Sequence, residues 1–212
     1  MQRYQLLTQN EIEQIHENSL RIMENIGIHM TYQPAKDLLA KGGAKVDGDT
    51  VYFPKKMVED NLKTVPSSFT MYARNPEKNV YIDTETTAYV GPYGSPFVTD
   101  MDKGRRRGTL EDFNNIVKIC DVLNNIDIQS HISCEPNDVE VSKRPNTMVY
   151  NTMKYSEKPL MGSVFGYETS RQCIELASIP FGGLSAIKEK PVISSIPCTL
   201  TPLSYDDNML GA

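Results

Sequence analysis

The chain has few of the residues that build metal sites, disulfide frameworks or strongly basic surfaces. It contains no tryptophan and three histidines, and its four cysteines are far apart, at Cys120, Cys134, Cys173 and Cys198. Because no C-x-x-C pair is present, the spacing predicts neither a zinc site nor a disulfide framework. We interpret the cysteines as small buried apolar side chains of a cytoplasmic protein.

Long apolar runs and phosphate-binding motifs are also absent. No stretch approaches the roughly 18 apolar residues of a membrane span, and residues 1–7 lack the apolar core of a signal peptide. The segment Gly91–Gly94 has no following Lys-Ser or Lys-Thr, so it is not a phosphate loop. A net charge of −5 argues against a protein that binds nucleic acid by neutralising phosphates. We therefore expect neither a nucleic acid nor a membrane as partner.

The composition is that of a globular protein with a mixed first half. Of 212 residues, 39% are hydrophobic and 23% charged, enough for one large or two small domains. A capping box at Thr8 and Glu11 opens a helix that Gly27 ends, and Thr109 with Asp112 opens another. The other predicted elements are short helices from residues 34 and 54, a hairpin over 45–53, and strands at 69–73 and 79–82.

Three adjacent arginines, Arg105–Arg107, stand in a segment that reads as a turn. We favour a solvated turn over an anion-binding site, because adjacent charges rarely converge on one ligand.

Three short apolar runs organise the second half. Two begin with a Lys-Pro pair, at residues 158 and 190, and the same step back leads to residue 126, where the first begins. Short runs of this kind, separated by segments of helical spacing, predict parallel strands joined by helical crossovers. The predicted fold class is α/β: an N-terminal α+β region over 1–125, then the first three or so βα units of an incomplete TIM barrel over 126–212. Three units do not close a barrel, so we expect a fragment, or a half that needs a partner; a small complete three-layer sheet is the structural alternative.

In parallel sheets, functional residues gather in the loops that follow the carboxyl ends of the strands. Carboxylates, hydroxyls and aromatic rings follow the predicted strands, and aromatic faces with carboxylates suit an organic cation, above all a quaternary ammonium. The predicted substrate-binding residues are Tyr93, Glu135, Phe165 and Tyr205, although core packing is the alternative for each aromatic ring. His131 and Cys134 are a poor metal pair, and no metal site or catalytic residue is assigned.

Several segments resemble the trimethylamine methyltransferase family, in order and in spacing. They are residues 7–16, 19–27, 39–47, 51–54, 66–74, 104–107, 109–112, 190–192 and 202–204. The resemblance implies a TIM barrel behind an N-terminal region, and transfer of a methyl group from a methylamine such as trimethylamine or glycine betaine to Co(I). It implies a corrinoid (cobalamin) carried by a separate partner protein, with none bound tightly by this chain. We also expect a homo-oligomer.

Two other interpretations stay open. The chain is then either a catalytically inert barrel half that serves as an assembly or binding module, or a different TIM-barrel enzyme in which Glu135 acts as acid or base.

Overall fold

Residues 5–212 are described by the computed structural model, so the expectation about a signal peptide falls partly outside the described residues. The chain divides into two units. Unit 1 takes the described residues up to Pro66 together with Cys198–Gly211, and unit 2 takes Ser67–Pro197 with Ala212. The domain boundary expected between residues 125 and 126 stays a prediction.

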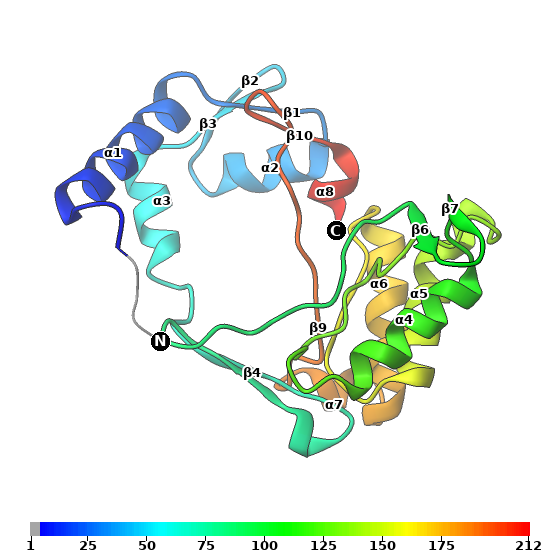
Figure 1. Ribbon diagram of the computed structural model, residues 1–212. Coiled ribbons are helices and arrows are strands. Elements are labelled where there is room, and N and C mark those ends of the chain that lie inside the picture. The colour runs from blue at the N-terminus through cyan, green and yellow to red at the C-terminus, as the bar shows by residue number, and fades with distance from the viewer. Residues whose placement is uncertain (1–4) are drawn as a thin grey trace. The chain divides into compact units, whose positions relative to one another are not determined.

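Unit 1 is a small sheet with helices, labelled in Figure 1. Its strand order is β10-β1-β3-β2, with β1 Ile28–Met30, β2 Lys45–Asp47, β3 Thr50–Tyr52 and β10 Ser204–Tyr205. Its helices are α1 Gln9–Asn25, α2 Gln33–Lys41, α3 Lys55–Leu62 and α8 Asp207–Gly211. The capping box at Thr8 and Glu11 is confirmed, as is the hairpin of β2 and β3.

The isoleucines of α1 are exposed rather than part of a core. Only Leu20 of this helix is fully buried, whereas Ile12, Ile15 and Ile22 of the helix are exposed, as is Ile26 directly after it. The core of unit 1 instead forms around the sheet, from Met30, Ala44 and Val51.

Unit 2 contains two hairpins, a parallel pair, four α-helices and three 3-10 turns. The strands are β4 Phe69–Met71, β5 Val80–Ile82, β6 Phe97–Asp100, β7 Gly104–Arg107, β8 Leu160–Met161 and β9 Ile193–Ser194. The α-helices are α4 Leu110–Val122, α5 Arg144–Tyr155, α6 Tyr167–Ser178 and α7 Leu184–Ile187, and the 3-10 turns are η1 Pro76–Lys78, η2 Val141–Lys143 and η3 Ile179–Phe181. The antiparallel pairing of β4 with β5 is confirmed.

The three apolar runs lie side by side and point the same way, as predicted. β8 pairs in parallel with β9, and Gln129 forms a parallel bridge to Leu160. Val90 forms a further parallel bridge to Ile128, so a strand-like segment that precedes the first run in the sequence lies beside it. The sheets formed by the described residues do not close into a barrel, and the assignment to a TIM barrel stays a prediction.

Each face of this parallel array packs against different elements, because successive side chains alternate across a strand. On one face, Ile128 and Met161 pack with Met71 of the β4–β5 hairpin. On the other, Leu160 packs with Val149 of α5 and Cys173 of α6. The array is thus covered by helices on one face and by a hairpin on the other.

Two smaller expectations need correction. The arginine segment is not a solvated turn: residues 104–107 form β7, and Arg106 forms ion pairs with Asp100 and Asp112. Cys198 is exposed rather than buried, whereas the other three cysteines are buried. Within residues 5–212, no helix is both long enough and apolar enough to cross a membrane.

Candidate functional site

Loops that follow neighbouring strands of the parallel array lie against each other. The loop after Val90 meets the loop after the first run through two hydrogen bonds, Gly94 N to Ile132 O at 2.8 Å and Glu135 N to Ser95 O at 2.8 Å. These bonds bring Tyr93 and Glu135 onto adjoining segments. Phe165 comes from the next loop, after β8, where its amide donates to Ser163 Oγ at 3.1 Å.

Three of the four predicted substrate-binding residues therefore follow the carboxyl ends of neighbouring strands. Tyr93 is 48% exposed and Phe165 is 52% exposed, so both rings have a face that a ligand can reach. Glu135 is half-buried, and one of its carboxylate oxygens accepts a hydrogen bond from Arg144 Nη1 at 3.0 Å. This ion pair fixes the Glu135 side chain and occupies part of its acceptor capacity.

Tyr205 is held by a different sheet from the other three. The sequence placed it in the loop after the third run, but it belongs to β10 and pairs with Met30 of β1. It packs against the core of unit 1 and lines a groove of about 740 Å³ there. Its role in substrate binding stays a prediction.

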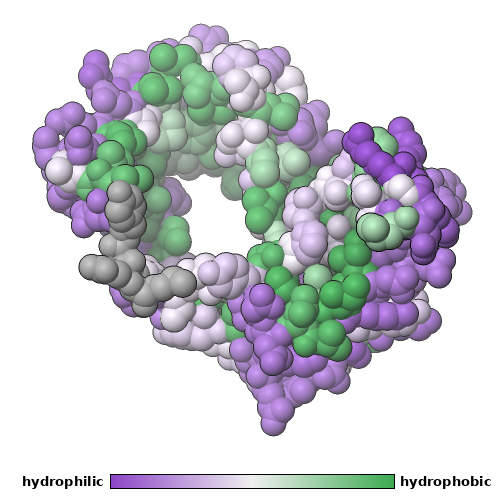
Figure 2. All heavy atoms as spheres, viewed as in Figure 1, coloured by the Kyte–Doolittle hydropathy of each residue, from purple (hydrophilic) through white to green (hydrophobic). Residues whose placement is uncertain are grey.

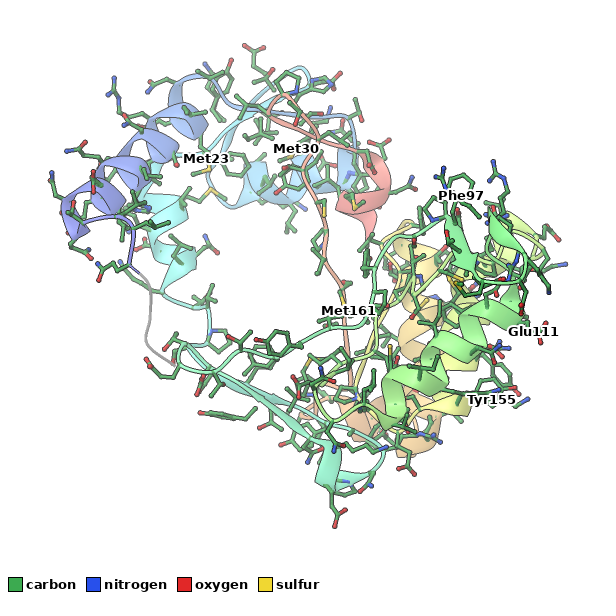
Figure 3. The ribbon with its side chains drawn as sticks, in the orientation of Figure 1. Met23, Met30, Phe97, Glu111, Tyr155 and Met161 are labelled. Atoms are coloured by element: carbon green, nitrogen blue, oxygen red, sulfur yellow. The ribbon has the colours of Figure 1, made fainter. Side chains whose placement is uncertain are left out.

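The groove in unit 1 is lined mainly by apolar side chains, among them Met23, Phe53 and Met57. Figure 3 labels Met23 and Met30, which both line it. Figure 2 shows that apolar residues reach the surface of this unit. Among residues 5–212, no ionisable side chain other than that of Tyr205 lines the groove, so these residues offer packing surface rather than acid–base chemistry.

Buried polar groups at the end of the first run were missed by the sequence analysis. Ser130 Oγ lies 3.0 Å from Ser133 Oγ, and Ser130 also donates to the Pro92 carbonyl. His131 between them is 2% exposed, and within residues 5–212 neither ring nitrogen has a hydrogen-bond partner. Burial lowers the pKa of His131 to about 4. The rule that selected Glu135, position just after a strand, could have selected these residues too.

The buried cysteines are candidate nucleophiles, and they and the acidic side chains are candidate metal ligands. Burial raises the pKa of Cys134 to about 11, and burial also raises the pKa of Cys120 and Cys173. These thiols stay protonated near neutral pH, which makes them poor nucleophiles. Residues 5–212 contain no group of three or more His, Cys, Asp or Glu side chains placed to hold a metal ion. The arrangement at the strand ends offers aromatic faces, hydroxyls and one paired carboxylate.

Comparison with known proteins yields a family and several relatives. The family model described as trimethylamine methyltransferase matches residues 1–212. A glycine betaine methyltransferase of Desulfitobacterium hafniense is 41% identical over 99% of this chain and 44% of its own length. A trimethylamine methyltransferase of the same species is 26% identical over 91% of this chain and 39% of its own length. A proline betaine:corrinoid methyltransferase of Eubacterium limosum is 25% identical over 95% and 44%, respectively. The chain thus spans less than half the length of these relatives.

Proposed function

Because the chain belongs to the trimethylamine methyltransferase family, we propose that it forms part of an enzyme that moves a methyl group from a tertiary or quaternary methylamine to the Co(I) of a corrinoid protein. The observation that carries the proposal is the family match over residues 1–212. We favour glycine betaine over trimethylamine as the donor, because the 41% identical relative is named a glycine betaine methyltransferase. Two relatives named as corrinoid methyltransferases support the acceptor.

The amine is proposed to bind at the carboxyl ends of the parallel array. Tyr93 and Phe165 present half-exposed rings there, and an aromatic face attracts a methylated ammonium group by cation–π interaction. A quaternary nitrogen has no N–H to donate, so aromatic faces suit it better than hydrogen-bond acceptors. Glu135, ion-paired with Arg144, supplies a carboxylate on the segment that adjoins Tyr93, and a role for Tyr205 in binding the amine stays a proposal from the sequence alone.

The proposed reaction requires mainly that the donor methyl group be positioned correctly. With a quaternary donor such as glycine betaine, the methyl group leaves a positively charged nitrogen, the C–N bonding pair stays on that nitrogen, and the amine departs neutral without needing a proton. The corrinoid of the partner supplies the nucleophile. This chain has to hold the methyl group in line with the acceptor and exclude water. The aromatic contacts weaken as the charge is lost, so they stabilise the bound donor more than the transition state.

Several further properties belong to the same proposal. The parallel array is proposed to be the opening of a TIM barrel, with an N-terminal region over 1–125 and barrel units over 126–212. The enzyme is proposed to be a cytoplasmic homo-oligomer that receives its corrinoid on a separate protein and binds none tightly itself.

A donor screen tests the activity. The enzyme of which this chain is proposed to form part is mixed with cob(I)alamin and with trimethylamine, glycine betaine, carnitine or choline, and the absorbance change of cobalamin methylation is followed. We expect methylation with one of these donors, and with glycine betaine first. Absence of methylation with all of them, in a preparation shown to be folded by circular dichroism, contradicts the proposal.

Substitution of the exposed rings tests the site. Tyr93→Ala or Phe165→Ala is expected to raise KM for the amine by ~2–30-fold, because each removes a cation–π contact of about 0.5–2 kcal/mol. Tyr150→Ala is the matched control, since Tyr150 is a 55% exposed aromatic residue on the outer helix α5. Kinetic constants unchanged in all three variants would remove Tyr93 and Phe165 from the site.

A further inference from the structure

The β6–β7 hairpin has two chemically different faces. Its register pairs Phe97 with Arg107 and Thr99 with Arg105, so these four side chains share one face. All four are exposed, and we call them the outer face. The alternate residues Val98 and Arg106 point the other way: Val98 packs against the cluster that contains Phe113 of α4.

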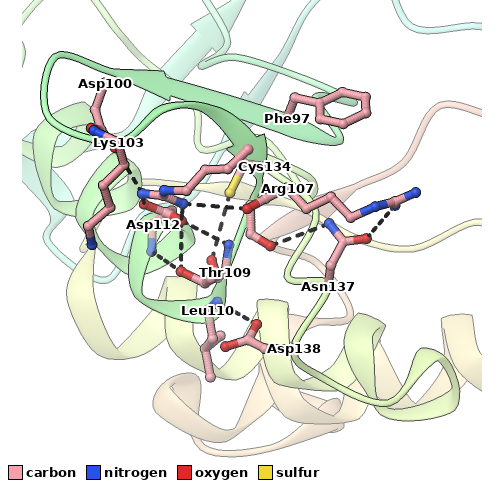
Figure 4. Close-up of polar contacts among 12 residues, drawn as sticks. Phe97, Asp100, Lys103, Arg107, Thr109, Leu110, Asp112, Cys134, Asn137 and Asp138 are labelled. Carbon is pink, nitrogen blue, oxygen red and sulfur yellow. Dashed lines mark hydrogen bonds and ion pairs between the residues drawn. The ribbon is translucent and has the colours of Figure 1, made fainter.

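The inner face fixes the hairpin to the rest of unit 2. Arg106 Nη2 donates to Asp112 Oδ1 at 2.8 Å and to Asp100 Oδ2 at 3.1 Å. Asp112 also accepts hydrogen bonds from Thr109 at the start of α4, as Figure 4 shows. These charge-assisted bonds neutralise Arg106 internally and hold the hairpin at the amino end of α4.

The outer face presents two cations on an aromatic ring. The Arg105 guanidinium lies 4.2 Å from the centroid of the Phe97 ring, and that of Arg107 lies 5.7 Å from it. Within residues 5–212, neither guanidinium forms an ion pair with a carboxylate. Phe97 is itself 38% exposed. Arginine and aromatic residues are among the types most enriched at protein interfaces. Here the charges of Arg105 and Arg107 are not neutralised by a carboxylate of the described residues.

The outer face borders the proposed amine site. Arg107 Nη1 donates to Asn137 Oδ1 at 3.1 Å, and Asn137 Nδ2 donates to the Glu135 carbonyl at 2.9 Å. Figure 4 shows Arg107 and Asn137 in contact. The hairpin thus stands beside Glu135, at the carboxyl ends of the strands. A protein that takes a methyl group from a donor bound there must approach from that side.

We propose that the outer face of the β6–β7 hairpin is a docking surface for the methyl-accepting corrinoid protein, and that it meets an acidic patch on that partner. The inference rests on the proposed function, since it concerns the acceptor of the same reaction. We infer an acidic partner surface from the charge of the hairpin. The segment 97–107 holds four cationic and two acidic side chains, in a chain whose net charge is −5. Opposite charge across an interface mainly speeds association and selects the partner.

A charge-reversal variant tests the docking surface. The protein with Arg105→Glu and Arg107→Glu is compared with wild type, using either a purified corrinoid protein from an amine methyl-transfer system or free cob(I)alamin as acceptor. We expect KM for the corrinoid protein to rise by ~10-fold or more, whereas the rate with free cob(I)alamin changes by less than about twofold. Raising the salt concentration from about 0.05 to 0.5 M should raise KM for the corrinoid protein in the wild type but not in the variant.

The matched control reverses two charges at the opposite ends of the strands. Lys188 and Lys190 are exposed and precede β9, so Lys188→Glu with Lys190→Glu makes the same change of net charge at the amino ends. KM for the corrinoid protein should stay near wild type in this control. If the arginine reversal impairs folding, Arg105→Gln with Arg107→Gln is tested in its place, with an expected increase in KM of ~3-fold or more.

The outcomes separate the two proposals. A wild type that methylates no acceptor contradicts the proposed function, and direct binding of the corrinoid protein by interferometry then still tests the hairpin. Equal loss in the arginine and lysine variants, or no loss in the arginine variants, overturns the docking surface while leaving the proposed function standing.

Discussion

At the scale of single residues, His131 has an environment that its neighbours in the sequence do not indicate. It is 2% exposed, and within the described part of the chain its two ring nitrogens lack hydrogen-bond partners. Burial disfavours the charged imidazolium and lowers the pKa of His131 to about 4. The folded protein therefore holds His131 neutral under conditions in which an unfolded chain protonates it.

This difference predicts a pH dependence of stability. As the pH falls below the ordinary value of 6.5, the unfolded chain binds a proton at His131 and the folded chain does not until about pH 4. The free energy of unfolding should therefore decrease over this window, by on the order of 3 kcal/mol in total, and become independent of His131 below it. Urea unfolding of wild type and His131→Leu at several pH values measures the effect.

The difference between the two proteins isolates His131 from the carboxylates that titrate in the same range. We expect the variant to lose less stability than wild type between about pH 6.5 and pH 4. His16→Leu, at an exposed position of α1, is the control and should follow the wild type. Parallel curves for wild type and His131→Leu would contradict the assignment of a buried neutral histidine.

At the scale of elements, the repeated Lys-Pro pair has two different roles. Lys190 is exposed, with its Nζ 5.9 Å from the Tyr72 ring centroid. Lys158 is 8% exposed, and its Nζ donates to three carbonyls just beyond or within the last turn of α4: Cys120 at 2.6 Å, Leu123 at 2.7 Å and Ile126 at 2.6 Å. Lys158 thus caps the carbonyl end of α4, where Leu123 O also accepts from Ile126 N at 3.2 Å. It ties α4 to β8 of the parallel array.

Replacing this buried ammonium group should weaken the α4–β8 connection. Lys158→Met keeps the length of the side chain but leaves the carbonyls without their donor, and we expect a loss of ~2–4 kcal/mol in the free energy of unfolding. Lys188→Met, at an exposed site, should change it by less than about 0.5 kcal/mol. Equal stability of the two variants in urea unfolding would mean that Lys158 does not serve as a cap.

At the scale of the whole molecule, residues 198–211, which follow residues 67–197 of unit 2 in the sequence, belong to unit 1. The His29 amide donates to the Leu203 carbonyl at 2.9 Å, and Thr31 Oγ1 donates to Asp207 Oδ1 at 2.5 Å. Leu210 of α8 packs against the core of Met30, Ala44 and Val51. Unit 1 is therefore built from two distant parts of the chain.

A chain shortened at Pro197 should lose order in unit 1 and keep it in unit 2. Without β10, the His29 amide has no acceptor, and we expect its hydrogen exchange to become ~10-fold faster or more. The Met161 amide donates to Gln129 O at 2.9 Å, and the Gly162 amide to Ser194 O at 2.7 Å. Both bonds lie in unit 2 and should keep their protection. Unchanged exchange at His29 would show that β10 contributes little to unit 1.

Local signals in the sequence were sufficient for most elements of this protein. The capping boxes at Thr8 and Thr109, the hairpin of β2 and β3, and the parallel order of the three apolar runs were all predicted and are confirmed. Each depends on residues within one turn, one hairpin or one repeated period. The family was also evident from the order of short segments along the chain.

Only the tertiary structure decided which distant segments meet. The pairing of Met30 with Tyr205, the burial of His131, the three carbonyls bound by Lys158 and the ion pair of Arg106 with Asp112 depend on partners from elsewhere in the fold. A short strand such as β10 has the same local sequence pattern whichever sheet it joins, because backbone groups can form the same hydrogen bonds with any neighbouring strand. Tyr205 therefore had a recognisable residue type, but its place in unit 1 came from packing.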